Sequence, residues 1–189
     1  MRFVGSMVLA SLLSTLSVEL AQAQDHWAAL KQSGHIVFLR HANAPGFTED
    51  PPGIDLKNCS LQRNLDEAGR AQARRIGDEF RKRGLSRVRL ISSQFCRTLE
   101  TAKLMNLGPV QGQAMLNYLN VDDGSKVDAY VVKAIDYLKT LRTGQPAVLV
   151  THISNIEMIS GARAASGEMV VTRFDQVGKL AVVGKIPPP

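Results

Sequence analysis

Apolar residues in this chain gather in short runs that predict five buried strands. Three runs of β-branched and aliphatic residues cover 35–40, 88–92 and 147–151, and two more close the chain at 169–174 and 180–186. Continuous apolar runs of this length are typical of strands that are covered on both faces of a sheet.

The segments between these runs have helical spacing instead. We expect helices over 64–83, 96–105, 126–141 and 155–164. The first would begin at Asn64, with Glu67 in the capping-box position, and end before Gly84. Strands that alternate with helices predict an α/β fold, a three-layer α/β/α sandwich with a mostly parallel central sheet. The segment 43–58 is rich in proline and glycine, which predicts an irregular loop over a pocket.

The amino-terminal segment has the three parts of a secretory signal peptide. One cation, Arg2, precedes an apolar run too short to span a bilayer, and the small residues of Ala21-Gln22-Ala23 follow. We expect a signal peptide over 1–23, cleaved after Ala23, and a single domain over 24–189. Glu19 favours the alternative, an uncleaved amphipathic helix. The cleaved protein would be periplasmic or secreted, with no stable membrane anchor.

The chain carries a formal net charge of +6, and many of its cations fall within the expected helix 64–83. A solvated helix face explains such a cluster, and attraction to anionic substrates or to a membrane surface is the alternative. Nucleic acid is not an expected partner, because only 5% of the residues are aromatic and no binding motif is present.

Two cysteines are present, Cys59 and Cys96. An exported chain meets oxidising conditions, so we expect a disulfide between them, which the chain-entropy model values at on the order of 4 kcal/mol. The alternative is two buried free thiols. Neither cysteine belongs to a Cys-x-x-Cys pair, so no metal site is expected.

Charged and titratable residues follow the expected strands where each strand ends. Arg40 and His41 come after the first strand, Arg97 opens the helix after the second, and His152 ends the third. Ligands of open α/β sheets bind outside the carboxyl ends of the strands, so these residues are expected to share one pocket.

These positions lie in motifs that resemble those of the histidine phosphatase superfamily, which includes the phosphoglycerate mutases. Phe38-Leu39-Arg40-His41-Ala42 is similar to the Arg-His-Gly signature, the block 92–102 to the second arginine block, and 148–152 to the block of the second histidine. The segment 65–73 resembles the helix start between the first two blocks. Two departures are Ala42, where the family usually has Gly, and Ile153-Ser154-Asn155, where many members have Gly-Asn or Gly-Gly.

The resemblance implies that His41 becomes phosphorylated and that water then attacks the phosphohistidine. Arg40, Arg97 and His152 would bind the phosphoryl group and balance its charge, and Arg63 is a further candidate for substrate binding. Guanidinium and imidazolium groups would take the place of a metal, so neither a metal nor a cofactor is expected.

A general acid must also protonate the leaving alkoxide, and the family uses a carboxylic acid for this step. Asp122, with Asp123 beside it, is the first choice, because the better-known branch carries its acid between the second and third blocks. Glu157 lies about one helical turn after His152, and Glu168 opens a strand. Those two are the alternatives, although carboxylates at such places are more often structural.

These features predict an exported phosphomonoesterase of the histidine acid phosphatase type, acting on a phosphorylated small molecule. A cell-envelope sugar phosphate is one candidate substrate, by resemblance to periplasmic histidine phosphatases that act on the phosphorylated heptose of the lipopolysaccharide core. The alternative is a non-catalytic or weakly catalytic phosphate-binding protein of the same fold. A mutase fits less well, because export removes the chain from cytosolic sugar phosphates. No motif indicates the oligomeric state.

Overall fold

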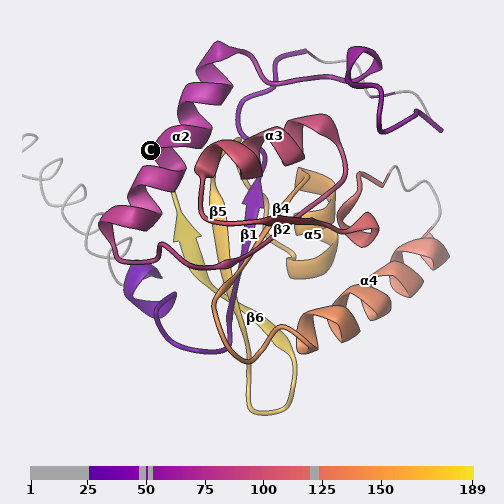
Figure 1. The fold of residues 1–189 in the computed structure, drawn as a ribbon. Helices are drawn as coiled ribbons and strands as arrows, with labels where there is room; N and C mark the ends of the chain where they lie inside the picture. The colour runs from indigo at the N-terminus through magenta and orange to yellow at the C-terminus, as the bar shows by residue number, and fades with distance from the viewer. Residues whose placement is uncertain (1–25, 47–49, 51–52, 120–123) are drawn as a thin grey trace, which may run out of the picture.

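The computed structural model of the chain describes residues 26–46, 50, 53–119 and 124–189 (Figure 1). Within these residues, six strands form one sheet in the order β3-β2-β4-β1-β5-β6. The strands are β1 (His35–Arg40), β2 (Arg89–Ser92), β3 (Val110–Gly112), β4 (Ala147–Thr151), β5 (Met169–Phe174) and β6 (Leu180–Ile186). Strands β1 to β4 are parallel to one another, whereas β5 is antiparallel to β1 and to β6. The expected signal peptide lies outside the described residues, and so do Asp122 and Asp123.

Helices cover both faces of the sheet (Figure 1). They are α2 (Glu67–Lys82), α3 (Cys96–Met105), α4 (Gly124–Lys139) and α5 (Ile153–Ser160), with short 3₁₀ helices η1 (Cys59–Leu61) and η2 (Ala114–Leu116) and a helical turn at residues 26–29. Two separate apolar clusters mark the two faces: one joins the sheet to α2 and α3, the other to α4 and α5. The predicted three-layer α/β sandwich is therefore confirmed.

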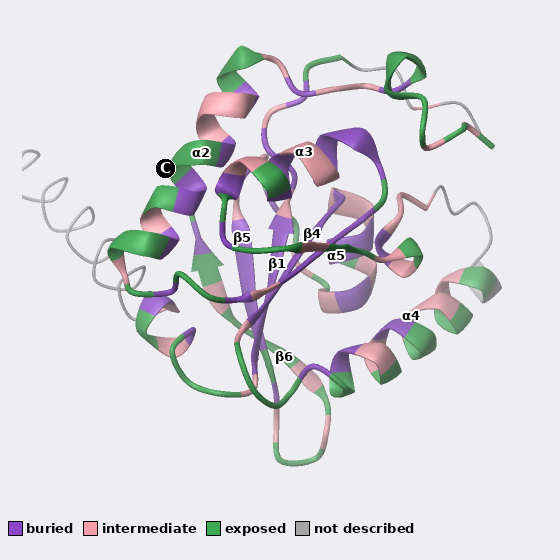
Figure 2. Ribbon diagram, viewed as in Figure 1, coloured by how far each residue is buried: buried purple, intermediate pink, exposed green. Residues whose placement is uncertain are grey.

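Strand β1 shows how the sequence builds these layers. Val37 and Leu39 pack in the cluster with α2 and α3, while Ile36 and Phe38 pack in the cluster with α4 and α5. Alternate side chains of a strand point to opposite faces, so a strand buried on both sides needs an apolar residue at every position. All four side chains are fully buried, and β1 lies with β4 and β5 in the purple centre of Figure 2.

Two local features differ from the sequence prediction. Strand β3 was not predicted, because it is a short edge strand on which Gln111 and Gly112 are exposed, and its segment has no clear pattern of apolar residues. The N-cap of α2 is Asp66 rather than Asn64: its carboxylate accepts a hydrogen bond from the Gly69 amide at 2.7 Å. The Asn64 side chain instead donates to backbone carbonyls of the preceding turn.

The cations of α2 have partners on the protein itself. Five of them form ion pairs with nearby carboxylates, namely Arg70, Arg74, Arg81, Lys82 and Arg83. The sixth, Arg75, donates to the carbonyl of Pro189 at 3.2 Å, which ties the carboxyl terminus to the helix. The pairing fits the simpler interpretation of a solvated helix face. No helix within the described ranges has both the length and the apolarity needed to cross a membrane.

Candidate active site

The site is built where β1, β2 and β4 end side by side. Strand β4 lies between the other two, with Thr151 opposite Arg40 and Val150 opposite Ser92. The residue after each strand therefore enters the same space. The His41 amide donates to the Thr151 carbonyl at 3.1 Å, and the rings of His41 and His152 lie 5.6 Å apart.

His41 is held as a neutral imidazole with one free nitrogen. Its Nδ1 lies 2.8 Å from the Ala42 carbonyl oxygen, which can only accept, so Nδ1 carries the proton and Nε2 keeps its lone pair. Burial lowers the pKa of His41 to about 3, and the positive charges of Arg97 and Arg40 add to the effect. A neutral imidazole with an unprotonated Nε2 is the form that can act as a nucleophile.

His152 uses both ring nitrogens in the pocket. Its Nδ1 accepts from Arg97 Nη2 at 3.3 Å, so Nε2 carries the proton and donates to Ser93 Oγ at 2.9 Å. Burial and then Arg97 hold the pKa of His152 well below its usual value. His152 is thus neutral before substrate binds. Its predicted contribution of positive charge to a bound phosphoryl group stays a prediction.

Arg97 enters from the first turn of α3 and is only 2% exposed. Its Nη1 donates to Asp50 Oδ2 at 2.6 Å, and its guanidinium lies 4.9 Å from the centre of the Phe95 ring. Burial lowers the pKa of Arg97, and the ion pair with Asp50 opposes that shift. The Arg97 Nε is buried without a partner, which leaves a donor available to a bound anion.

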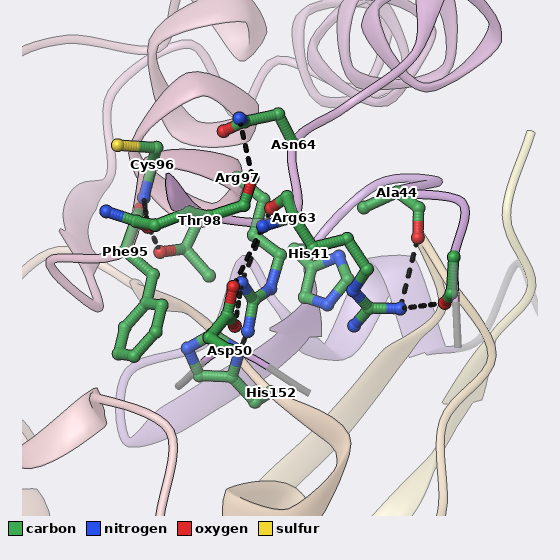
Figure 3. Close-up of polar contacts among 12 residues, drawn as sticks. His41, Ala44, Asp50, Arg63, Asn64, Phe95, Cys96, Arg97, Thr98 and His152 are labelled. Atoms are coloured by element: carbon green, nitrogen blue, oxygen red, sulfur yellow. Dashed lines mark hydrogen bonds and ion pairs between the residues drawn. The ribbon is translucent and has the colours of Figure 1, made fainter. Parts of the chain in front are cut away.

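Arg40 and Arg63 add positive charge to the same pocket. Both contribute to the lowered pKa of His41. Arg40 Nη1 donates to the Ala164 carbonyl at 2.9 Å, and its Nε is buried without a partner. Arg63 Nη1 donates to the carbonyls of Ala44 and Gly46, each at 3.1 Å (Figure 3). The structure therefore brings together all the site residues predicted from the strand ends, and Arg63 with them.

Sequence reasoning missed two pocket residues, Asp50 and Ser93. The Asp50 carboxylate is 4% exposed, and besides its pair with Arg97 it accepts from the Arg63 amide at 2.8 Å. Ser93 follows β2, and its hydroxyl accepts from His152 Nε2. Its place at a strand end was a usable signal, whereas Asp50 lies in a loop with no periodic pattern.

The carboxylates predicted as general acid are not in the described pocket. Glu157 is exposed and pairs with Arg163. Glu168 accepts from the Ala165 amide at 2.7 Å and lies 3.7 Å from Lys185 Nζ. Asp122 and Asp123 fall outside the described residues. An acid role for any of the four stays a prediction.

The expected disulfide between Cys59 and Cys96 is present and joins η1 to the first residue of α3. The Cys96 amide also donates to the Gln62 side chain at 2.9 Å. Because Arg97 is the next residue, these contacts fix the turn that carries its guanidinium. In the part of the chain that the structure describes, no three His, Cys, Asp or Glu side chains gather as metal ligands.

Comparison with known proteins agrees with this geometry. Residues 36–123 match the family model of the histidine phosphatase superfamily, branch 1. The block of His152 lies beyond the matched residues. Among curated proteins, no sequence matches the chain.

Solved structures share the fold at low sequence identity. The protein histidine phosphatase SixA complexed with tungstate is 11% identical, with a TM-score of 0.60 over 82% of this chain and 97% of that one. A variant of phosphoserine phosphatase from Entamoeba histolytica in complex with phosphoserine is 13% identical, with a TM-score of 0.58 over 80% and 95%. A mycobacterial glucosyl-3-phosphoglycerate phosphatase in complex with VO3 is 15% identical, with a TM-score of 0.57 over 79% and 97%. Such likeness establishes the fold.

A neutral buried histidine among arginines, at the carboxyl ends of a mostly parallel sheet, is an arrangement suited to phosphoryl transfer. By its match over residues 36–123 the chain is similar to the histidine phosphatase superfamily, and its fold is phosphoglycerate mutase-like. The family match and the fold support a phosphatase activity.

Proposed function

We propose that the protein is an exported phosphomonoesterase that hydrolyses a phosphate ester through a phosphohistidine intermediate on His41. The observation that carries the proposal is the state of His41: neutral, with Nε2 unprotonated, between Arg40 and Arg97. A phosphoryl group attacked by a neutral nitrogen needs fixed positive charge around its oxygens, and the two arginines supply it.

The reaction takes two steps on these residues. The phosphoryl oxygens bind Arg40 and Arg97, whose buried Nε groups have no partner among the described residues. His41 Nε2 forms a bond to phosphorus as the ester oxygen leaves. Water then attacks the phosphohistidine, the P–N bond breaks, and inorganic phosphate departs. The hydrogen bond from Nδ1 to the Ala42 carbonyl holds the ring and stabilises its positive charge during the first step.

The substrate we propose is a phosphorylated small molecule. The neighbours support this class, since they include a phosphatase bound to phosphoserine and one that acts on glucosyl-3-phosphoglycerate, and two of them hold oxyanions. The signal-peptide pattern of 1–23 supports export, and export favours a sugar phosphate of the cell envelope.

A second candidate function is phosphate binding with little turnover. It is favoured by the partners of Glu157 and Glu168, which engage both carboxylates outside the pocket. Without a proton donor, the leaving alkoxide would be expelled slowly.

Hydrolysis of p-nitrophenyl phosphate by the purified protein tests the proposal. This leaving group needs little protonation, so the assay reports His41 and the arginines and does not depend on the acid. We expect turnover by the unaltered protein and a loss of at least about a hundredfold in His41→Asn. A protein that binds inorganic phosphate but releases no nitrophenol would be a binding protein.

A further inference from the structure

We propose that Asp50 is the general acid of this site, the carboxyl that protonates the leaving oxygen of the ester. The inference rests on the phosphatase function proposed above and assigns the one step that function leaves open. Its starting point is the buried ion pair between Asp50 and Arg97, which the sequence did not indicate.

The position of Asp50 is that of a pocket residue. Its Oδ2 accepts from Arg97 Nη1 at 2.6 Å and its Oδ1 from the Arg63 amide at 2.8 Å, so two contacts orient the carboxylate. Figure 3 shows it beside the Arg97 guanidinium, in the group that includes His152 and Arg63. Among the described residues, it is the one carboxylate paired with a pocket arginine.

Charge balance gives this carboxyl a proton when substrate arrives. Arg97 is the guanidinium that binds phosphoryl oxygens, and Asp50 already occupies one of its amino groups. A phosphate ester bound as its monoanion on the same guanidinium lies next to the carboxylate and brings one proton. Two anions at hydrogen-bond distance repel each other, and sharing the ester's proton with the Asp50 carboxylate removes the repulsion. Substrate binding therefore places a protonated carboxyl beside the group that is about to leave.

The proton then follows the bonds that change. As His41 Nε2 bonds to phosphorus, the P–O bond breaks and its electron pair stays on the ester oxygen, which takes the proton from Asp50. In the second step the ionised carboxylate accepts a proton from water as the water oxygen bonds to phosphorus. The P–N electron pair returns to Nε2, and phosphate takes the proton back from Asp50 and leaves as its monoanion. His41 and Asp50 then end in their starting states.

The test compares two esters in Asp50→Asn. An aryl phosphate has a leaving group that departs without a proton, whereas glycerol 2-phosphate releases an alkoxide that needs one. We expect kcat/KM for glycerol 2-phosphate to fall roughly a hundredfold or more, and kcat/KM for p-nitrophenyl phosphate to change less than about threefold. The ratio of the two kcat/KM values is the readout, because it reports the step in which the ester oxygen leaves and does not depend on the later attack of water or on the fraction of folded protein.

Asp55→Asn is the matched control, since Asp55 is exposed and its carboxylate accepts from the Lys57 amide in the loop itself. Its kcat/KM ratio should equal that of the unaltered protein. Asp50→Glu keeps a carboxyl and should recover part of the glycerol 2-phosphate activity.

Three results in Asp50→Asn overturn the inference. They are an equal loss of activity on both esters, no loss on either, and a gain on both. The gain would mean that Asp50 only blocks Arg97. If the unaltered protein hydrolyses neither ester, the proposed function is itself wrong and the inference falls with it. If it hydrolyses the aryl ester alone, the phosphatase stands and Asp50 is not an effective acid.

Discussion

His41 illustrates how burial prepares a single residue for its role. An ordinary histidine is half protonated near pH 6.5, and a protonated imidazole cannot attack phosphorus. Burial lowers the pKa of His41 to about 3, so its ring is neutral at neutral pH. The same shift makes the folded state sensitive to acid.

We expect stability to fall as the pH drops from 6.5 toward 3. In that window the unfolded chain binds a proton at His41 that the folded chain excludes, so protons favour unfolding; above pH 6.5 the effect vanishes. His41→Asn should lose less stability between pH 7 and pH 4, because the unfolded variant has no imidazole at position 41 to bind a proton. The part of the acid sensitivity that comes from His152 should remain. Urea unfolding at the two pH values measures the difference. The same loss in both proteins would contradict the assigned state of His41.

The arginines of the pocket should differ in how much they contribute to catalysis. Arg97 is buried and holds Asp50 and His152 together, whereas Arg63 binds two loop carbonyls through its side chain. We expect Arg97→Ala to lower kcat/KM for an aryl phosphate about a hundredfold, and Arg63→Ala much less. Steady-state kinetics of the two variants, with inorganic phosphate binding as a check on the pocket, decide the point. Equal losses would mean that the phosphoryl group is bound elsewhere.

Sequence reasoning found most of the pocket residues at strand ends but missed Ser93 there, and it missed Asp50 in the loop. Arg40, His41 and His152 are placed by the sheet, whose strand ends are readable from apolar runs. Asp50 contacts Arg97 across 47 residues of sequence, from a loop whose path no local pattern specifies. A contact of this kind depends on tertiary packing alone.

Among the helices and strands, too, those with a clear local pattern were predicted and those without one were missed. The structure matches the ranges predicted for β1, β4, β5, β6 and α3. The first three are buried runs and α3 is a short helix with clear ends, whereas β6 is an apolar run that is largely exposed. The exposed edge strand β3 was missed, and the start of α2 was placed at Asn64 because an Asn-x-x-Glu pattern also fits a cap. Asp66 is the N-cap because its carboxylate accepts a hydrogen bond from the Gly69 amide.

Two glycines of α2 give a matched test of how this helix supports the site. A Cβ on Gly69 would lie 2.0 Å from the Asn43 carbonyl oxygen, in the segment that follows His41, and one on Gly77 would lie 2.0 Å from the Met105 carbonyl oxygen at the far end of α3. In a free helix, glycine to alanine stabilises by about 1 kcal/mol. Here we expect both substitutions to destabilise, by roughly 1–3 kcal/mol.

Only Gly69→Ala should also lower kcat for an aryl phosphate, because only it displaces the segment beside His41. Thermal unfolding and kinetics of the two variants test this pair of expectations. A stabilising Gly69→Ala, or an equal loss of kcat in Gly77→Ala, would show that α2 does not hold the site in this way.

For the molecule as a whole, the disulfide between Cys59 and Cys96 is the main covalent constraint in the described chain. It closes a loop with a sequence separation of 37, which in the chain-entropy model is worth about 4 kcal/mol. We expect reduction to lower the unfolding temperature and to weaken phosphate binding, since the bridge holds the Arg97 turn. Calorimetry with and without a reductant measures the first effect, and phosphate titration the second. His41 should stay able to attack phosphorus in the reduced protein. Unchanged stability and unchanged phosphate binding after reduction would mean that the disulfide has no structural role.

His41 should carry the phosphoryl group during turnover, and rapid acid quenching of the protein with a ³²P-labelled aryl phosphate detects that intermediate. We expect a protein-bound adduct that is labile in acid and stable in alkali, formed by the unaltered protein and absent in His41→Asn. Label that persists in His41→Asn would show that another residue is phosphorylated.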